Sequence, residues 1–186
     1  MSSAQDKDEL WLDDDIIELD DDEAVVTKAI NPWQVLIVDD EPDIHHATRL
    51  ALSNIQYKSR PLELLNAYSG AEAARMLLAN PRIALILLDV VMETEDAGLR
   101  LVHQIRNEMH NSLVRIVLRT GQPGQAPEQR VILDYDINDY KTKTELTVQK
   151  LYTTVIASLR SYETLCAIDK SRQGLGKILE GAGDLY

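Results

Sequence analysis

The stretch IALILLDVVMET, residues 83–94, sets an aspartate, Asp89, at the end of an almost uninterrupted apolar run. Residues 83–88 have the composition of a strand that is buried on both faces of a sheet. An unpaired carboxylate is costly to bury, so Asp89 must either reach a surface or meet a cation. The neighbouring segments bear on which of the two applies.

Similar apolar segments alternate with helical patterns on both sides of this stretch, and a helix follows each of them, the last one from near Thr144. Five strands that alternate with five helices indicate an α/β fold with an open, doubly wound, mainly parallel sheet. Such sheets bind ligands outside the carboxyl ends of their strands, so we expect that Asp89 need not be buried. The predicted strands are 33–42, 62–67, 83–89, 114–120 and 135–141.

Functional side chains stand at the ends of four of these five strands. The first strand ends in Asp39 and Asp40, and the third ends in Asp89. Thr120 ends the fourth strand, and Lys143 follows the fifth. One such aspartate alone is typical of a turn, but the same end of successive strands carries all of them. The five residues therefore indicate one site at one edge of the sheet.

The residue types at this edge point to a particular chemistry. Carboxylates that converge repel one another unless a cation intervenes, and Mg²⁺ is the hard divalent ion that suits oxygen ligands. A lysine ammonium and a threonine hydroxyl suit a tetrahedral anion. Together these groups indicate phosphoryl transfer to a carboxylate, with Asp89 as the nucleophile.

The segments VLIVDDEP, LILLDVVM, IVLRTG and INDYKTK together resemble the receiver domain of two-component response regulators. The resemblance covers roughly residues 33–160 and implies a flavodoxin-like receiver fold with a five-stranded sheet. It also implies a function: the chain would accept a phosphoryl group from a sensor histidine kinase or a phosphotransfer protein. The phosphorylated chain would then switch an output or a partner.

The resemblance implies a role for each matching residue at the acidic edge. Asp89 would be the phosphoacceptor and also a ligand of Mg²⁺. Asp40 would bind Mg²⁺ directly, and Asp39 would bind it largely through water. The backbone carbonyl of Val91 would be a further ligand.

The resemblance assigns the remaining residues to the response that follows phosphorylation. Thr120 would hydrogen-bond to the phosphoryl oxygens, and Lys143 would pair first with Asp89 and then with the phosphoryl group. Tyr140, three residues before that lysine, matches the aromatic switch position. Lys141 is a nearby alternative, but the pattern DYxxK selects Lys143.

Three positions depart from the family pattern. Thr144 follows the site lysine where proline is usual, and Glu93 stands where the loop after the phosphoacceptor usually carries proline. That loop is also one residue longer before Gly98. Gly121 follows Thr120 where a small residue is expected, which keeps the site open. None of the three departures removes a chemical group from the site.

Composition limits the other functional classes. The net charge of −12 argues against nucleic acid as a direct partner, because binding to phosphates needs clustered basic residues. No apolar stretch approaches the ~20 residues of a membrane span, and Cys166 is the single cysteine. We therefore expect a soluble, cytoplasmic protein without membrane insertion.

The predicted receiver, residues 32–160, is flanked by two further segments. Residues 1–31 form an acidic tail, and residues 6–23 alone carry eleven of the 31 acidic side chains. This tail is expected to be disordered, with a short docking segment as the alternative. Residues 161–186 are expected to form a helical extension and a linker to an output domain, because glycines cluster after Gln173.

An apolar stripe in the last predicted helix outruns the receiver. It recurs at steps of three and four residues: Leu151, Val155, Leu159, Tyr162, Leu165 and Ile168. Its first part must pack on the sheet, whereas the extension needs a second copy or a downstream domain to cover it. We predict a concentration-dependent homodimer with Leu159 and Tyr162 at the centre of the seam. An ordinary final helix with a frayed tail is the alternative.

Two other functions compete with the signalling module. Residues 115–146 resemble receivers at the front of HD-GYP cyclic di-GMP phosphodiesterases, so the chain is alternatively a regulatory fragment whose catalytic domain lies beyond Tyr186. It lacks an HD pair and a GYP triplet, so no enzyme activity is expected of it, and His45 and His46 are expected on a helix surface. A phosphatase of the haloacid dehalogenase type fits less well, because those enzymes carry Asp-x-Asp on the first strand.

Overall fold

The computed structural model describes residues 31–121, 137–143 and 147–183, with side chains up to Gly174. The predicted acidic tail before Asn31 and the predicted fourth helix lie outside the described residues. Thr144, where the family pattern has proline, also lies outside them.

A six-stranded sheet forms the centre of the described chain, in the order β2-β3-β1-β4-β5-β6. Parallel pairings join β3 to β1, β1 to β4, β4 to β5 and β5 to β6. The parallel sheet was therefore predicted correctly, and each predicted strand overlaps an observed one. The strands are β1 (Trp33–Val38), β2 (Gln56–Tyr57), β3 (Arg60–Ala67), β4 (Ile83–Asp89), β5 (Arg115–Thr120) and β6 (Asp139–Thr142).

The prediction of five strands was wrong by one, because β2 pairs antiparallel with the start of β3. Two residues are too few for any hydrophobic period to show in the sequence. The turn between the strands is formed by Lys58 and Ser59, with φ of 52° and 59°. Such tight hairpins usually use Gly, Asn or Asp at these positions, so the sequence carries no turn signal here.

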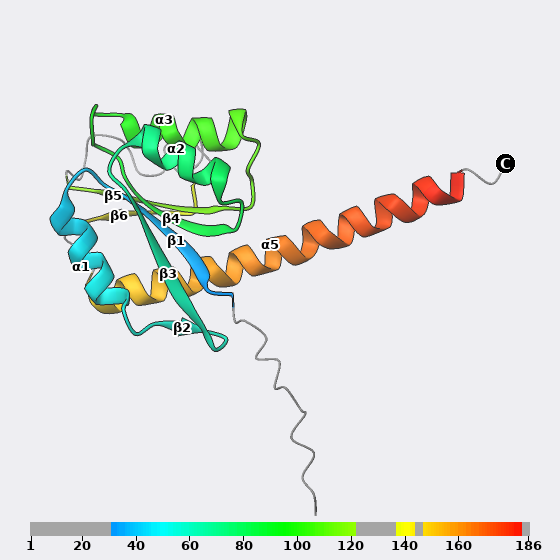
Figure 1. The fold of residues 1–186 in the computed structure, drawn as a ribbon, viewed down its shortest axis with the longest axis horizontal. Coiled ribbons are helices and arrows are strands. Elements are labelled where there is room, and N and C mark those ends of the chain that lie inside the picture. The colour runs from blue at the N-terminus through cyan, green and yellow to red at the C-terminus, as the bar shows by residue number, and fades with distance from the viewer. Residues whose placement is uncertain (1–30, 122–136, 144–146, 184–186) are drawn as a thin grey trace, which may run out of the picture. The chain divides into compact units, whose positions relative to one another are not determined.

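Helices cover both faces of the sheet, with α1 and α5 on one face and α2 and α3 on the other (Figure 1). Ser69 caps α2, because its hydroxyl accepts a hydrogen bond from the amide of Glu72 at 3.2 Å. The helix predicted to follow the third strand is divided, because its second part is a π-helix. The helices are α1 (Pro42–Leu52), α2 (Gly70–Ala79), α3 (Ala97–His103) with its π-helical continuation η1 (Gln104–Glu108), and α5 (Val148–Gly183).

The central strands β1 and β4 are buried along their whole length, as the apolar stretch 83–88 predicted. Side chains of alternate residues point to opposite faces, so each strand contributes to two core layers. Leu36, Ile86 and Leu88 lie in the layer under α2 and α3. Val35 and Leu85 lie in the layer under α1 and α5. Because β1 and β4 are parallel, their carboxyl ends lie at the same edge of the sheet.

The first part of α5 packs on the sheet through Leu151, Val155 and Leu159, which are all buried. Leu159 has no exposed surface at all, so the prediction that it lies at the centre of a dimer seam was wrong. The side chain of Tyr162 also packs within the domain, because its ring contacts the ring of Trp33 edge to face with centroids 6.5 Å apart. The sheet covers more of the apolar stripe than the sequence indicated.

The β2–β3 hairpin holds α5 where the helix leaves the sheet. The Nζ of Lys58 lies 2.7 Å from Oε2 of Glu163, and the hydroxyl of Tyr57 donates to the same oxygen at 3.2 Å. The indole of Trp33 donates to the carbonyl of Tyr57 at 3.0 Å. These contacts join the unpredicted strand β2 to the helix beyond the expected end of the receiver.

The α5 helix continues to Gly183, so the glycines after Gln173 do not end it. The expectation of a linker after Gln173 therefore differs from the observed backbone, which is helical through Gly183. A single glycine costs a helix only about 1 kcal/mol relative to alanine, which the surrounding turns can offset. Within the described part of the chain, no helix has both the length and the apolar character to cross a membrane.

The different surroundings of two leucines on α5 lead to a testable prediction. Leu159→Ala should lower the free energy of unfolding by ~2–5 kcal/mol, because it opens a cavity in the core. Leu165→Ala, at a half-buried position on the same helix, should lower it by about 1 kcal/mol or less. Urea denaturation of both variants measures this difference. Equal losses would contradict the packing of α5 described above.

Candidate functional site

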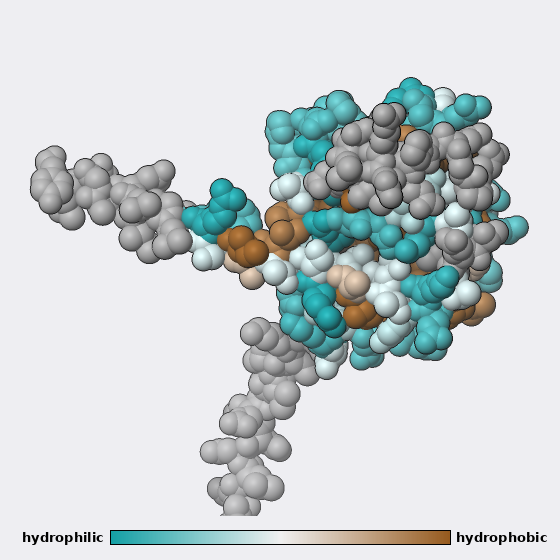
Figure 2. Space-filling model, turned by 180° about the vertical axis from the view of Figure 1, so that it is seen from behind, coloured by the Kyte–Doolittle hydropathy of each residue, from teal (hydrophilic) through white to brown (hydrophobic). Residues whose placement is uncertain are grey.

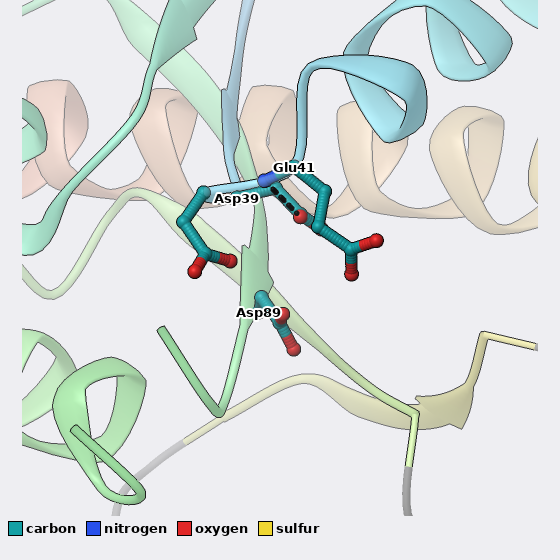
Figure 3. A group of neighbouring side chains, drawn as sticks. Asp39, Glu41 and Asp89 are labelled. Carbon is teal, nitrogen blue, oxygen red and sulfur yellow. Dashed lines mark hydrogen bonds between the residues drawn. The ribbon is translucent and has the colours of Figure 1, made fainter. Parts of the chain in front are cut away.

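Four carboxylates lie at the carboxyl ends of β1 and β4, which are neighbours in the sheet. They belong to Asp39, Asp40, Glu41 and Asp89, and one oxygen of each lies within 4.8 Å of the others. Figure 3 shows Asp39 and Glu41 next to the end of β1, with Asp89 on the adjacent strand. The amide of Glu41 donates to Oδ1 of Asp39 at 3.1 Å, which fixes the turn between β1 and α1.

Two of these carboxylates are buried, and two are exposed. Asp39 is 0% and Asp89 is 3% exposed, whereas Asp40 and Glu41 face solvent. The expectation that Asp89 need not be buried was therefore wrong. Its strand ends at the edge of the sheet, but its carboxylate is buried and paired with a cation. Of the two possibilities that the sequence left open for Asp89, a cation is the one that the structure provides.

That cation is Lys143, which joins three of the carboxylates. Its Nζ lies 2.9 Å from Oδ2 of Asp89, 3.2 Å from Oδ2 of Asp39 and 3.0 Å from Oε1 of Glu41. The backbone sets this position, because the Lys143 amide donates to the carbonyl of Thr120 at 2.7 Å just after β5 and β6 end their pairing.

The alternative lysine, Lys141, takes no part in this group. It forms an ion pair with Asp139 at 3.2 Å on its own strand, β6. The structure therefore brings Lys143, the lysine selected by the pattern DYxxK, to the carboxylates.

A second cation, Arg119, also contacts Asp39, and this one is buried. Its Nη2 lies 3.4 Å from Oδ2 of Asp39, and its Nη1 donates to Oγ1 of Thr48 at 3.0 Å. Sequence reasoning gave this residue no role. The sequence did contain a signal for its role, because Arg119 is a long cationic residue in an otherwise apolar segment just before Thr120. The neighbouring strand ends in Asp89. Arginine is almost never buried without a partner, so that interruption predicts an acidic neighbour.

Burial and ion pairing act against each other at the two central groups. Burial raises the pKa of the Asp89 carboxyl above its ordinary value, and the hydrogen bond and charge of Lys143 only partly offset this effect. Burial alone would lower the pKa of Lys143, but its hydrogen bonds to Asp89 and Glu41 outweigh burial, and the net shift is upward. Lys143 is therefore a permanent cation at neutral pH.

The loop that follows Asp89 is held tightly against it. The amide of Val91 donates to Oδ1 of Asp89 at 3.4 Å, so the peptide unit of Val91 lies beside the carboxylate. The Gly98 amide donates to the carbonyl of Val90 at 3.0 Å, and a Cβ at Gly98 would collide with the backbone of Asp89. Glu93, at the position where proline is usual, accepts from the Gly70 amide at 3.0 Å. That contact ties the loop to the first turn of α2.

The two predicted switch residues lie on the strands beside this loop. Thr120 ends β5 and is buried, with 2% of its surface exposed. Tyr140 lies in β6, and its side chain packs into the core layer under α2 and α3. Their predicted roles in switching stay predictions, but both residues stand on the two strands that position Lys143.

One histidine departs from its predicted environment. His46 is exposed, as expected, but His45 is buried, so its placement on the helix surface was wrong. The Nε2 of His45 lies 2.7 Å from the carbonyl oxygen of Asp39, and its ring packs against Tyr68. The helical period shows why, because His45 precedes buried Thr48 by three residues on the same face of α1.

Comparison with known families agrees with this geometry. Residues 35–156 match the response regulator receiver domain, so the chain belongs to the response regulator receiver family. Residues 155–186 match a domain of unknown function (DUF3369), which overlaps most of α5. The second match begins where the first one ends, within the part of α5 that packs on the sheet.

A curated relative covers most of the chain. The 3'3'-cGAMP-specific phosphodiesterase 2 of Vibrio cholerae serotype O1 is 52% identical over 163 residues, which is 88% of this chain. The chain spans only 31% of the length of that relative. The region that is similar to this chain is therefore a minor part of that longer protein.

Solved structures show the same fold. A receiver domain protein from Clostridium thermocellum superposes with a TM-score of 0.61 at 19% identity, covering 72% of this chain and 98% of that one. A putative response regulator from Chloroflexus aurantiacus gives 0.59 at 25% identity, with 70% and 99% covered. The receiver domain of an HD domain-containing protein from Pseudomonas fluorescens gives 0.58 at 20% identity, with 72% and 99% covered.

The raised pKa of Asp89 leads to a prediction about stability. Asp89→Asn should leave the protein at least as stable as the wild type at pH 7, because the substitution removes a carboxylate whose charge burial disfavours. A raised folded-state pKa favours folding most at low pH, and this benefit disappears as the pH rises past the folded-state value. The advantage of the variant should therefore shrink toward pH ~4, near the ordinary carboxyl pKa. Urea denaturation at both pH values measures it, and marked destabilisation at pH 7 would contradict the prediction.

Proposed function

We propose that Asp89 accepts a phosphoryl group and that the other residues at this edge of the sheet support the transfer. The observation that carries the proposal is the position of Lys143, 2.9 Å from Asp89 within a group of four carboxylates. A purely structural ion pair would not need four acidic groups this close together. An acidic edge that is only partly neutralised suits a site that also binds a divalent ion and a phosphoryl group.

The donor set fits Mg²⁺. Carboxylate oxygens are the ligands that this hard cation prefers, and the four acidic groups already lie close together. When all are ionised, four negative charges face the two positive charges of Lys143 and Arg119, which leaves two to be balanced. Asp40, Asp89 and the Val91 carbonyl would hold the ion directly, and Asp39 would hold it largely through water.

Bound Mg²⁺ would neutralise charge on the transferring phosphoryl oxygens. An oxygen of the Asp89 carboxylate attacks the phosphorus, and the bond from phosphorus to the donor nitrogen or oxygen breaks. The leaving group keeps the electron pair of that bond and takes up a proton. Lys143 then pairs with the phosphoryl group, and Thr120 hydrogen-bonds to its oxygens while Tyr140 responds as the switch residue.

The phosphodonor would be a sensor histidine kinase or a phosphotransfer protein in the cytoplasm. Membership in the receiver family supports this class of partner. The charge of −12 favours a protein over nucleic acid as the direct partner.

A second proposal concerns the output. The identity of 52% to a cyclic dinucleotide phosphodiesterase favours a role as the regulatory part of an enzyme of that class. The name of the relative specifies 3'3'-cGAMP rather than the cyclic di-GMP that the sequence resemblance implied. The catalytic domain would lie beyond Tyr186, and α5 would connect it to the receiver.

The phosphoacceptor is tested by chemical labelling. Wild-type protein incubated with acetyl phosphate or phosphoramidate and Mg²⁺ should gain a hydroxylamine-labile phosphoryl group. Asp89→Asn should lose this label, because an amide forms no acyl phosphate. Asp40→Ala should label slowly and need more Mg²⁺, because it removes a direct ligand.

Asp96→Asn is the matched control for this labelling, because Asp96 lies in the same loop but is exposed and pairs with Arg100 at 2.7 Å. It should label as the wild type does. Undiminished labelling of Asp89→Asn would exclude Asp89 as the phosphoacceptor. Sustained release of phosphate without a stable label would favour a phosphatase instead.

The predicted dimer is retained as a proposal, with a different seam. Figure 2 shows hydrophobic side chains on α5 where the helix leaves the sheet. Leu165 is half-buried, and Ile168 is 52% exposed. A second copy of the chain would cover these residues, whereas Leu159 stays in the core. So few large residues give modest affinity, so we expect a concentration-dependent dimer.

Sedimentation velocity across a concentration series tests the dimer. The wild-type sedimentation coefficient should rise with concentration, and Ile168→Asp should remove this rise because it places a charge in the apolar seam. Leu78→Asp is the control, since Leu78 is 71% exposed on α2, away from α5. A wild type that stays monomeric at high micromolar concentration, with and without a phosphoryl mimic, would exclude the dimer.

A further inference from the structure

Arg119 is a buried cation that the proposed chemistry does not use. It is the penultimate residue of β5, and it pairs in register with Asp89 on β4. Its side chain is only 4% exposed. Burial of a charged side chain is costly, so the position of Arg119 next to the acidic group needs a physical reason.

Its contacts fix the guanidinium between α1 and the site. The Nη1 donates to Thr48 on α1 at 3.0 Å, and the Nη2 lies 3.4 Å from Asp39. Thr48 is itself buried, so it is a rigid anchor. A guanidinium stays protonated at every working pH, so Arg119 is a permanent positive charge at Asp39.

Lys143 is held in a different way. It is shared by Asp39, Glu41 and Asp89, and its side chain is 17% exposed. A cavity of about 190 Å³ adjoins both Lys143 and Arg119, between α1 and the start of α5. Lys143 is therefore less buried than Arg119, and Arg119 is in addition held by Thr48.

The burial of Asp39 limits the movement of Lys143. Asp39 is 0% exposed, so its carboxylate needs a cation at all times. If Lys143 were the sole cation at Asp39, each movement of the lysine away from Asp39 would leave a buried charge unpaired. Arg119 removes this conflict, because it stays with Asp39 when the lysine moves.

We propose that Arg119 is a positioning residue, which stays paired with the Asp39 carboxylate and holds it in place while Lys143 gives way to a divalent ion and then follows the phosphoryl group. The inference rests on the proposed function of Asp89. It adds Arg119 as a second cation, which stays at Asp39 so that Lys143 can move.

The direction in which Mg²⁺ affinity changes when Arg119 is removed distinguishes a positioning residue from a nearby charge without such a role. A bystander cation repels Mg²⁺, so its removal would tighten Mg²⁺ binding. A positioning cation has the opposite effect. Without Arg119, Lys143 must stay with Asp39, and displacing it by Mg²⁺ becomes harder, so Mg²⁺ binding weakens.

Calorimetric titration with MgCl₂, without a phosphodonor, provides the test on the whole chain. The Kd for Mg²⁺ should rise about tenfold in Arg119→Leu, the effect expected for loss of a charged hydrogen bond. Arg119→Lys, which keeps the charge, should restore most of the affinity. Arg115→Leu is the matched control, because Arg115 is also buried and begins the same strand at its opposite end. Its Mg²⁺ affinity should equal that of the wild type.

A double substitution gives a second readout. In a Lys143→Ala background there is no lysine for Asp39 to retain, so adding Arg119→Leu should no longer weaken Mg²⁺ binding. Equal weakening in both backgrounds would assign Arg119 a general structural role and overturn the proposal. Unchanged or tighter Mg²⁺ binding by Arg119→Leu alone would also overturn it.

Two further outcomes remain decisive. If Arg119→Leu does not fold, Thr48→Val replaces it, because that variant removes only the anchor of the guanidinium. Thr48→Val must then weaken Mg²⁺ binding, by about twofold to threefold, or the proposal fails. A wild type that binds Mg²⁺ and labels at Asp89, beside an Arg119→Leu variant that binds Mg²⁺ more tightly, overturns this inference alone. A wild type that does not label at Asp89 overturns both it and the proposed function.

Discussion

The ion pair between Lys143 and the buried carboxylates of Asp39 and Asp89 is the interaction on which this site depends. A parallel sheet sets the ends of β1 and β4 side by side, so their terminal aspartates are forced together. Two buried carboxylates at this distance repel each other unless a cation lies between them. The backbone hydrogen bond from the Lys143 amide to the Thr120 carbonyl places that cation, so the sheet backbone positions the group that balances the charge of the site.

The same electrostatics relate the site to the rest of the domain. Arg119 reaches Asp39 from β5 and is anchored on α1, so residues of both elements compensate the charge of the buried carboxylate after β1. On the opposite side, Glu93 ties the loop after Asp89 to α2. A change of charge at Asp89 therefore acts on groups that α1, α2 and the end of β6 hold in place. This arrangement suits a domain whose proposed task is to turn phosphorylation into a change of contacts.

The helix α5 continues beyond the region that matches the receiver family. Its first turns belong to the core under the sheet, and the hairpin formed by β2 and β3 grips Glu163 further along. The receiver match ends at residue 156 and the second family match begins at 155, so one helix serves both. Because core packing fixes its direction, α5 moves with the sheet rather than as a loose tether.

The sequence by itself determined the strands, the parallel sheet and the group of residues at its edge, because strand periodicity and short motifs are local signals. The resemblance to receiver domains, through its pattern DYxxK, selected Lys143 over Lys141. Tertiary structure decided what depends on contacts between distant segments. It buried Asp89 and His45, added β2, placed Leu159 in the core and brought Arg119 to Asp39 across 80 residues of chain. No local pattern encodes such pairings, because burial and charge compensation are properties of neighbours in space.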